Sequence, residues 1–401
     1  MYRRATALLV STAVLMWVTT YVVGLRYDQA PVEPEGKMLG PSLTMALDLL
    51  DVDVSSITLL SLILVVDVVI RSFTILLAGL AIDLGVRGLW QSWRRRRRFK
   101  EVVAERFRDH WTRGRMRLVV VGTLCFYVTY VCYRNLKSFL PFVRSDPDAP
   151  PGEVRALSYD RELHLVDRVL FFGHDPSDVL HGLLGTNVAA HFLSQVYLAY
   201  LPMVVTLVLV WLVWSRTLSF GYWFVCAQVL GWSLGTLSYY LLPTLGPGIA
   251  YWPRYTKLAH TPTTDLMDGI TNARGRYLYD DSVEGILNSV AGFASLHVAI
   301  SLLWVLAIQY TLRSRKLTIF GWIFFACTVV ATLYFGWHYV ADDVAGVSIA
   351  VVSFYVGGLA AGQRFTRRPR GGATASEDGA DGGNGGDGDA EAEPAATAPA
   401  S

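Results

Sequence analysis

The chain has 401 residues, of which 53% are hydrophobic and 17% are charged, and its formal net charge is +2. A soluble domain carries about 25% charged residues, so this composition excludes an ordinary soluble enzyme. The apolar residues come in blocks of about 20, the length that crosses a bilayer as a helix. Since the one strongly basic stretch is short, we expect no nucleic-acid partner.

Taken in chain order, the apolar blocks predict an all-α polytopic membrane protein with about eight transmembrane helices. The first block follows Arg3 and Arg4 and is too long for the apolar region of a signal peptide, so we expect it to be retained. The third block is short and is expected to extend to about residue 137. The predicted spans are 5–24, 55–82, 118–132, 192–214, 219–242, 293–312, 318–338 and 343–362.

The basic residues between these spans predict the orientation of the chain. With eight spans, every Lys and Arg cluster in a short loop falls on one side, which the positive-inside rule assigns to the cytoplasm. We therefore expect a multi-pass plasma-membrane protein with both termini in the cytoplasm and three longer segments outside, at about 25–54, 138–191 and 243–292. The clusters lie at residues 3–4, 94–100, 113–117, 216, 313–316 and 364–370.

Four regions follow from this pattern. Residues 1–92 hold two N-terminal spans, 93–117 form a basic cytoplasmic loop, and 118–362 form a six-helix catalytic membrane domain. The loop is interpreted as a positive-inside anchor, with an amphipathic helix on anionic lipid as the alternative. Residues 363–401 are rich in Gly, Ala and acidic residues and have almost nothing to bury, which predicts a disordered cytoplasmic tail.

Two histidines at the outer ends of neighbouring spans are the candidate catalytic groups. His297 begins one apolar run and His338 ends the next. Asp342 follows His338 by four residues, a spacing that puts two side chains on one helical face, so its carboxylate can fix the imidazole tautomer. Ionisable groups at membrane depth are costly, which favours a functional reading of this set. In contrast, His174, Asp175 and His181 are expected at the surface.

Several motifs resemble the type-2 phosphatidic acid phosphatase superfamily. They are Ala294-Ser295-Leu296-His297 and His338-x-x-x-Asp342-x-x-x-Gly346, together with the Pro-rich turn at 243–248 and the Tyr- and Pro-containing stretch at 197–202. The inositol phosphorylceramide synthase-like branch, whose members are inositolphosphotransferases, is the most similar, because it also has Ser-Leu-His. The resemblance covers roughly residues 118–362.

This resemblance implies a two-step reaction without a metal or another cofactor. His338 would attack phosphorus to give a phosphohistidine, with Asp342 orienting its ring. His297 would protonate the leaving oxygen and then act as the base toward the acceptor. The implied phosphate-binding residues are Lys137, Arg134 and Ser295.

Two departures from the superfamily pattern bear on the activity. The third motif usually opens with Ser-Arg, but Ala331 and Thr332 stand at those positions, and the inositolphosphotransferase branch also lacks this Arg. The first motif, at 134–141, has a Lys and a Pro without the usual spacing to an Arg-Pro. The assignment of Lys137 therefore leaves alternatives among the outer loops, namely Arg144, Arg254, Arg274 and Arg276.

The sequence thus predicts a phosphotransferase that moves a phospho-headgroup, inositol phosphate or a phospho-sugar, from a lipid donor to an alcohol. The donor would be a membrane phospholipid or a polyprenyl phosphate, and the acceptor an alcohol or a lipid. The first alternative is a lipid or polyprenyl phosphate phosphatase that uses water as acceptor. The second is a scaffold or transporter that kept the fold without the activity.

Overall fold

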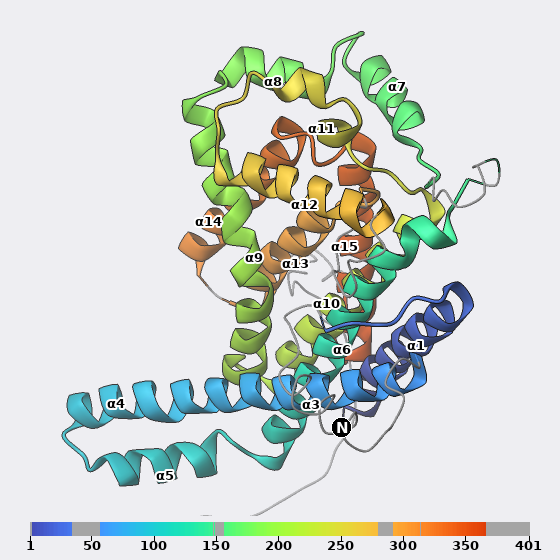
Figure 1. The fold of residues 1–401 in the computed structure, drawn as a ribbon. Helices are drawn as coiled ribbons and strands as arrows, with labels where there is room; N and C mark the ends of the chain where they lie inside the picture. Colours follow the sequence, from blue (N-terminus) through green and yellow to red (C-terminus); the bar gives the residue numbers. More distant parts are fainter. Residues whose placement is uncertain are drawn as a thin grey trace, which may run out of the picture. The chain divides into compact units, whose positions relative to one another are not determined.

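The protein is built from helices packed side by side (Figure 1). The computed structural model describes residues 2–33, 57–146, 148, 156–279, 292–312 and 314–365, and this part contains no strand. Residues up to Arg364 form one compact unit. These observations confirm the predicted all-α class, while the tail predicted at 363–401 lies outside the described residues beyond Phe365.

Each of the eight predicted spans corresponds to one apolar helix. Six of the helices are long and apolar enough to cross a membrane. Helix α13 has 16 residues, about 24 Å at 1.5 Å per residue, which is shorter than a typical hydrocarbon core. The helices are α1 (Arg3–Tyr27), α3 (Ile57–Ala81), α6 (Arg113–Val143), α9 (Val188–Trp214), α10 (Leu218–Leu241), α13 (Leu296–Thr311), α14 (Arg315–Tyr334) and α15 (Val340–Ala360).

Helix α10 is not among the six because it is the central helix of the bundle. It packs against α1, α6, α9, α13 and α15, and it buries residues around most of its circumference. A helix surrounded by protein can carry Gly, Ser and Tyr where a lipid-facing helix carries Leu and Val. At Gly235, for example, a Cβ atom would lie 2.5 Å from Leu296 of α13.

Helix α1 also belongs to this bundle. Its Ala5 and Leu9 side chains are fully buried in the same apolar cluster as residues of α6 and α10. The sequence offered no role for the first span beyond anchoring. Its packing shows that α1 completes one side of the core.

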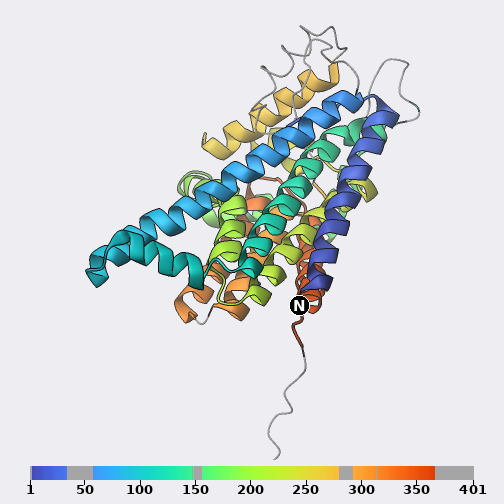
Figure 2. The same ribbon diagram turned by 90° about the horizontal axis from the view of Figure 1, so that it is seen from below.

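Short helices lie at both ends of the long ones. Figure 1 shows α7, α8 and α11 close together at one end, whereas α4 and α5 extend away from the other helices, as Figure 2 also shows. A π-helical turn at Ile82–Val86 makes α3 continuous with α4. The short helices are α4 (Arg87–Arg95), α5 (Phe99–Asp109), α7 (Asp160–Leu170), α8 (Pro176–Leu184), α11 (Pro247–Ala250) and α12 (Pro262–Tyr279), with a 3-10 turn at Trp252–Tyr255.

A buried carboxylate joins the basic segment to the bundle. Asp83, in the π-helical turn, accepts hydrogen bonds from Trp111 Nε1 at 2.9 Å and Trp214 Nε1 at 2.6 Å. Arg106 Nε and Nη2 donate to the same carboxylate at 3.1 and 3.0 Å. Arg115, counted in the sequence only as a positive charge, is buried and donates to the Leu212 and Ser215 carbonyls. Part of the basic loop therefore has a structural function.

Replacing Asp83 with Ala leaves the Arg106 guanidinium and two indole N–H groups without their acceptor. Removing one partner of a buried ionic network costs about 3 kcal/mol of unfolding free energy. Thermal unfolding of the full chain in detergent measures this loss. Glu105→Ala is the control, since Glu105 makes exposed ion pairs with Arg95 and Arg97 that contribute less than about 1 kcal/mol. Equal losses in the two variants would contradict this account.

Candidate active site

His297 and His338 lie close together although they come from separate chain segments. His297 lies in the first turn of a helix, and His338 lies just before one. His297 is the second residue of α13, directly after the N-cap residue Ser295 and Leu296. His338 lies in the connection between α14 and α15. The ring centroids are 5.9 Å apart, and Nδ1 of His338 lies 3.4 Å from Oδ2 of Asp342. The structure thus gathers the three residues predicted to be catalytic.

The route to this geometry differs from the prediction. The span predicted at 318–338 ends as a helix at Tyr334, so His338 and Asp342 do not share a helical face. Asp342 is in the first turn of α15, and its Oδ2 reaches back to accept the backbone N–H of Tyr339 at 2.9 Å. The Asp342 carboxylate therefore contacts His338 at the N-terminus of α15. The chain can turn here because Gly336 takes a φ of +71°, which favours glycine.

Aromatic rings fix the orientation of His297. The rings of Tyr197 and Tyr200 lie with their centroids 4.5 Å from the His297 ring. Both come from the α9 stretch that resembles the superfamily's Tyr- and Pro-containing span. Nε2 of His297 is buried and has no hydrogen-bond partner among the described residues. This nitrogen is therefore available to a substrate oxygen.

Lys137 and Arg134, the two basic residues predicted to bind phosphate, have different surroundings. Lys137 lies near enough to His297 to interact with it electrostatically, and its ammonium is 5.9 Å from the Tyr133 and Tyr239 ring centroids. Arg134 Nη1 donates to the Tyr130 hydroxyl at 3.4 Å.

The hydroxyl of Ser295 has structural partners. It accepts the Val298 N–H at 3.4 Å as the cap of α13 and hydrogen-bonds to Asp343. Asp343 also accepts from the hydroxyl of Thr332 at 3.2 Å. Since Thr332 and the fully buried Ala331 stand where the superfamily usually has Ser-Arg, a buried hydroxyl–carboxylate contact occupies the position of the missing Arg.

Asp160, which the sequence analysis did not single out, holds the Pro-rich turn against the loop of His338. Its carboxylate accepts the N–H groups of Leu245 and Gly246 at 2.9 Å each and the Tyr339 hydroxyl at 2.9 Å. Gly246 has a φ of +86°, and a Cβ there would lie 2.4 Å from the Trp337 carbonyl oxygen. Only glycine permits this approach.

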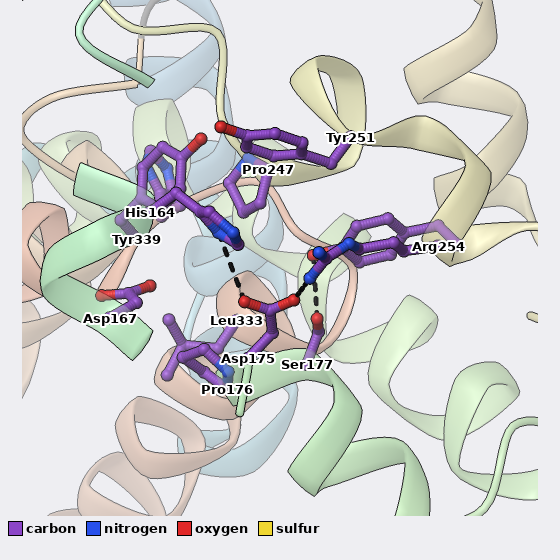
Figure 3. A pocket seen from close by; sticks show the side chains of 12 residues that line it. His164, Asp167, Asp175, Pro176, Ser177, Pro247, Tyr251, Arg254, Leu333 and Tyr339 are labelled. Carbon is purple, nitrogen blue, oxygen red and sulfur yellow. Dashed lines mark hydrogen bonds and ion pairs between the residues drawn. The ribbon is translucent and has the colours of Figure 1, made fainter. Parts of the chain in front are cut away.

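A pocket opens beside His338, and Figure 3 shows its lining. The ionisable side chains are His164 and Asp167 of α7, Asp175, Arg254 and His338. Figure 3 shows His164 and Arg254 both directed at Asp175. The His164 Nδ1 atom is 3.3 Å from that carboxylate, and Arg254 forms an ion pair with it. We predicted Asp175 at the surface, which is wrong, because these two partners allow the carboxylate to be buried.

The two histidines predicted at the surface, His174 and His181, differ in their exposure. His174 is exposed, as predicted. His181 is partly buried, and its Nε2 lies 2.8 Å from the carbonyl oxygen of Tyr334.

Burial changes the pKa of two groups in this pocket. It raises the pKa of Asp167 to about 7, and the nearby Asp342 carboxylate adds to the effect. Burial also lowers the pKa of His164, with a contribution from the Arg254 charge. Asp167 is held in place by the backbone N–H of Val340, which donates to its two oxygens at 3.1 and 3.3 Å. The first residue of α15 is thus anchored to α7.

No local sequence pattern reveals the burial of Asp160 and Asp167. They are seven residues apart, which places them on the same face of α7, and Leu163 between them is buried on that face. The opposite face exposes Val166 and Val169. This pattern is the reverse of an ordinary amphipathic surface helix, so a reading based on apolar periodicity assigns the acids to solvent.

Comparison with known proteins gives one family match. Residues 161–356 match the PAP2 superfamily model, and this segment includes both histidines and Asp342. The match supports the resemblance to the type-2 phosphatidic acid phosphatase superfamily, although it does not distinguish a branch within it. No curated protein and no solved structure matches the chain.

The pKa of Asp167 makes stability depend on pH. Its pKa is raised from 3.8 to about 7 by folding, so the native state holds the proton more strongly than the unfolded state. This contribution is complete below about pH 4 and is lost as the pH rises to about 7. We expect Asp167→Asn to abolish that loss and to be more stable at pH 8 by about 1–2 kcal/mol, after allowance for screening by water. Thermal unfolding of both proteins between pH 4 and 8 tests this. Parallel pH profiles would refute it.

Proposed function

We propose that this membrane protein, with its PAP2 superfamily segment, is a phosphotransferase that works through a phosphohistidine. It would transfer a phospho-headgroup from a lipid donor to an alcohol. One observation supports this most directly: His338 has Asp342 at its Nδ1, while the facing His297 has an unpartnered Nε2. A nucleophile held by a carboxylate and an acid facing it are the two groups that phosphoryl transfer without a metal requires.

In the first step, Nε2 of His338 attacks phosphorus. Asp342 accepts the Nδ1–H bond, which leaves the lone pair on Nε2 and stabilises the positive charge that develops on the ring. The N–P bond forms as the P–O bond to the lipid alcohol breaks, and protonated His297 gives its proton to the departing oxygen. The 5.9 Å between ring centroids suits a phosphoryl group with reacting atoms about 3–3.5 Å apart.

In the second step, His297 acts as the base. Now neutral, it removes the proton from the acceptor hydroxyl while that oxygen attacks phosphorus and the P–N bond breaks. His338 returns to its neutral form and His297 to its protonated form. The same two residues therefore serve both half-reactions.

Fixed positive groups would stabilise the charge on the transferring phosphoryl group. Helices α13 and α15 both begin at the site, and helix N-termini favour anions. Lys137 lies near His297, and we propose it as the main phosphate ligand, assisted by Arg134. We propose that Ser295 supports the phosphate mainly by fixing the start of α13.

Transfer to an alcohol is favoured over hydrolysis by the burial of the site and by Thr332. His338 is only 6% exposed, and exclusion of water protects a phosphohistidine from hydrolysis. Thr332 in place of the superfamily Arg resembles the inositolphosphotransferase branch, which suggests inositol phosphate or a phospho-sugar as the transferred group. We also propose that the site faces the outside of the plasma membrane, because the basic clusters lie in loops on the other side.

The decisive experiment follows labelled phosphorus from phosphatidylinositol in lipid nanodiscs with a panel of alcohol acceptors. We expect label to move to an acceptor and the rate to fall about 10³-fold or more in His338→Ala and in Asp342→Asn, since these variants remove the nucleophile or its orienting group. The matched control is His174→Ala, an exposed histidine of the same outer region, which should retain full activity.

The other outcomes separate the alternatives. Label released only to water would identify a phosphatase. Activity that survives His338→Ala would exclude the phosphohistidine, and a wild type inactive toward phosphatidylinositol and polyprenyl phospho-sugars would favour a scaffold. Trapping label on the protein at an acid-labile bond, in wild type only, would establish the intermediate.

A further inference from the structure

A second pocket lies at the end of α6, next to the Pro-rich turn. It has about 320 Å³ of empty space, part of it open to solvent. Arg144 and Arg274 are in its lining together with Thr244 and with Ser158, whose hydroxyl donates to Asp160. No acidic residue is among the described residues that line it. We call it the arginine pocket.

Arg144 is positioned by the end of α6. It is the C-cap residue of this helix and follows Lys137 by seven residues. The Nε atom of Arg144 is buried and has no hydrogen-bond partner among the described residues. Since a buried, unpaired donor of a charged group is unfavourable, this atom marks a place for an acceptor.

The arginine pocket adjoins the pair of His338 and Asp342. Thr244, part of its lining, accepts the backbone N–H of Gly292 at 2.9 Å through its carbonyl. A Cβ on Gly292 would lie 2.3 Å from the Thr244 hydroxyl oxygen and 3.5 Å from Oδ2 of Asp342. A single glycine therefore fills the space between the pocket wall and the proposed catalytic carboxylate.

We propose that the arginine pocket is an anion subsite for a phosphate group distinct from the one that His338 attacks. Arg presents a planar set of donors that matches phosphate in a bidentate manner, and the hydroxyl of Thr244 adds a further donor. In the pocket beside His338, by contrast, the only guanidinium in the described lining, that of Arg254, is already paired with Asp175. The role of this subsite rests on the proposed function: it would select a donor or an acceptor that carries a second phosphate group.

Equilibrium binding of labelled inorganic phosphate tests the subsite without turnover. The full chain, with His297→Ala and His338→Ala to remove the reacting imidazoles, is placed in nanodiscs of phosphatidylcholine. Each of Arg144→Gln and Arg274→Gln should weaken phosphate binding about tenfold, the effect of one charge-assisted hydrogen bond. Arg276→Gln is the control for net charge, since Arg276 is exposed on the same helix as Arg274, and it should leave binding unchanged.

A second variant keeps both arginines. Ala156 lines the pocket, so Ala156→Glu introduces a carboxylate there and should also weaken phosphate binding, with folding checked by thermal unfolding. Equal affinity in all variants, or an equal effect of Arg276→Gln, would overturn the proposal.

Phosphatidic acid added to the discs distinguishes the source of the phosphate group. Displacement of free phosphate by this lipid would identify a lipid headgroup as the occupant, whereas its failure to displace would identify soluble phosphate. Because no turnover is measured, a failed subsite and a failed phosphotransferase are separate results.

Discussion

The position of His338 depends on buried carboxylates that accept hydrogen bonds from Tyr339 and Val340, around the start of α15. Asp342 accepts the N–H of Tyr339, Asp167 accepts that of Val340, and Asp160 accepts the Tyr339 hydroxyl. Burying charged or polar groups is costly unless each is hydrogen-bonded, so these contacts specify one loop conformation. Without these hydrogen bonds, the loop after α14 would not be held in the conformation that places the His338 ring near His297.

This arrangement couples the site to the outer helices. Asp160 and Asp167 both belong to α7, which lies outside the long helices, yet they hold the loop of His338 and the Pro-rich turn. A substitution in α7 would therefore change the position of His338. Asp175 is a further buried carboxylate of this kind, since it contacts His164 and Arg254 in the pocket beside His338.

Much of this architecture could be predicted from the sequence, because lipid-facing helices are long and apolar. The two histidines and Asp342 were singled out because few ionisable groups occur near such segments, and the structure places them close together. The acids of α7 were missed because their burial depends on long-range partners, such as Leu245 and Tyr339, that no local pattern reveals. The central position of α10 and the loop conformation of His338 likewise arise from packing, and periodicity extended the helix through 338 when it ends at Tyr334.

Two pockets near the histidines differ in their charged residues, and this difference suggests how two substrates could be distinguished. In the pocket beside His338 the carboxylates have partners, since Arg254 and His164 contact Asp175 and the Val340 N–H donates to Asp167. The arginine pocket has two guanidiniums and, among its described lining, no acid. The arginine pocket would therefore attract an additional anionic group more strongly, because a charged partner in a low-dielectric site is strongly discriminated. The proposed transferase would have to hold a donor and an acceptor in turn at one phosphorus, and two pockets with different charged residues would help it to distinguish them.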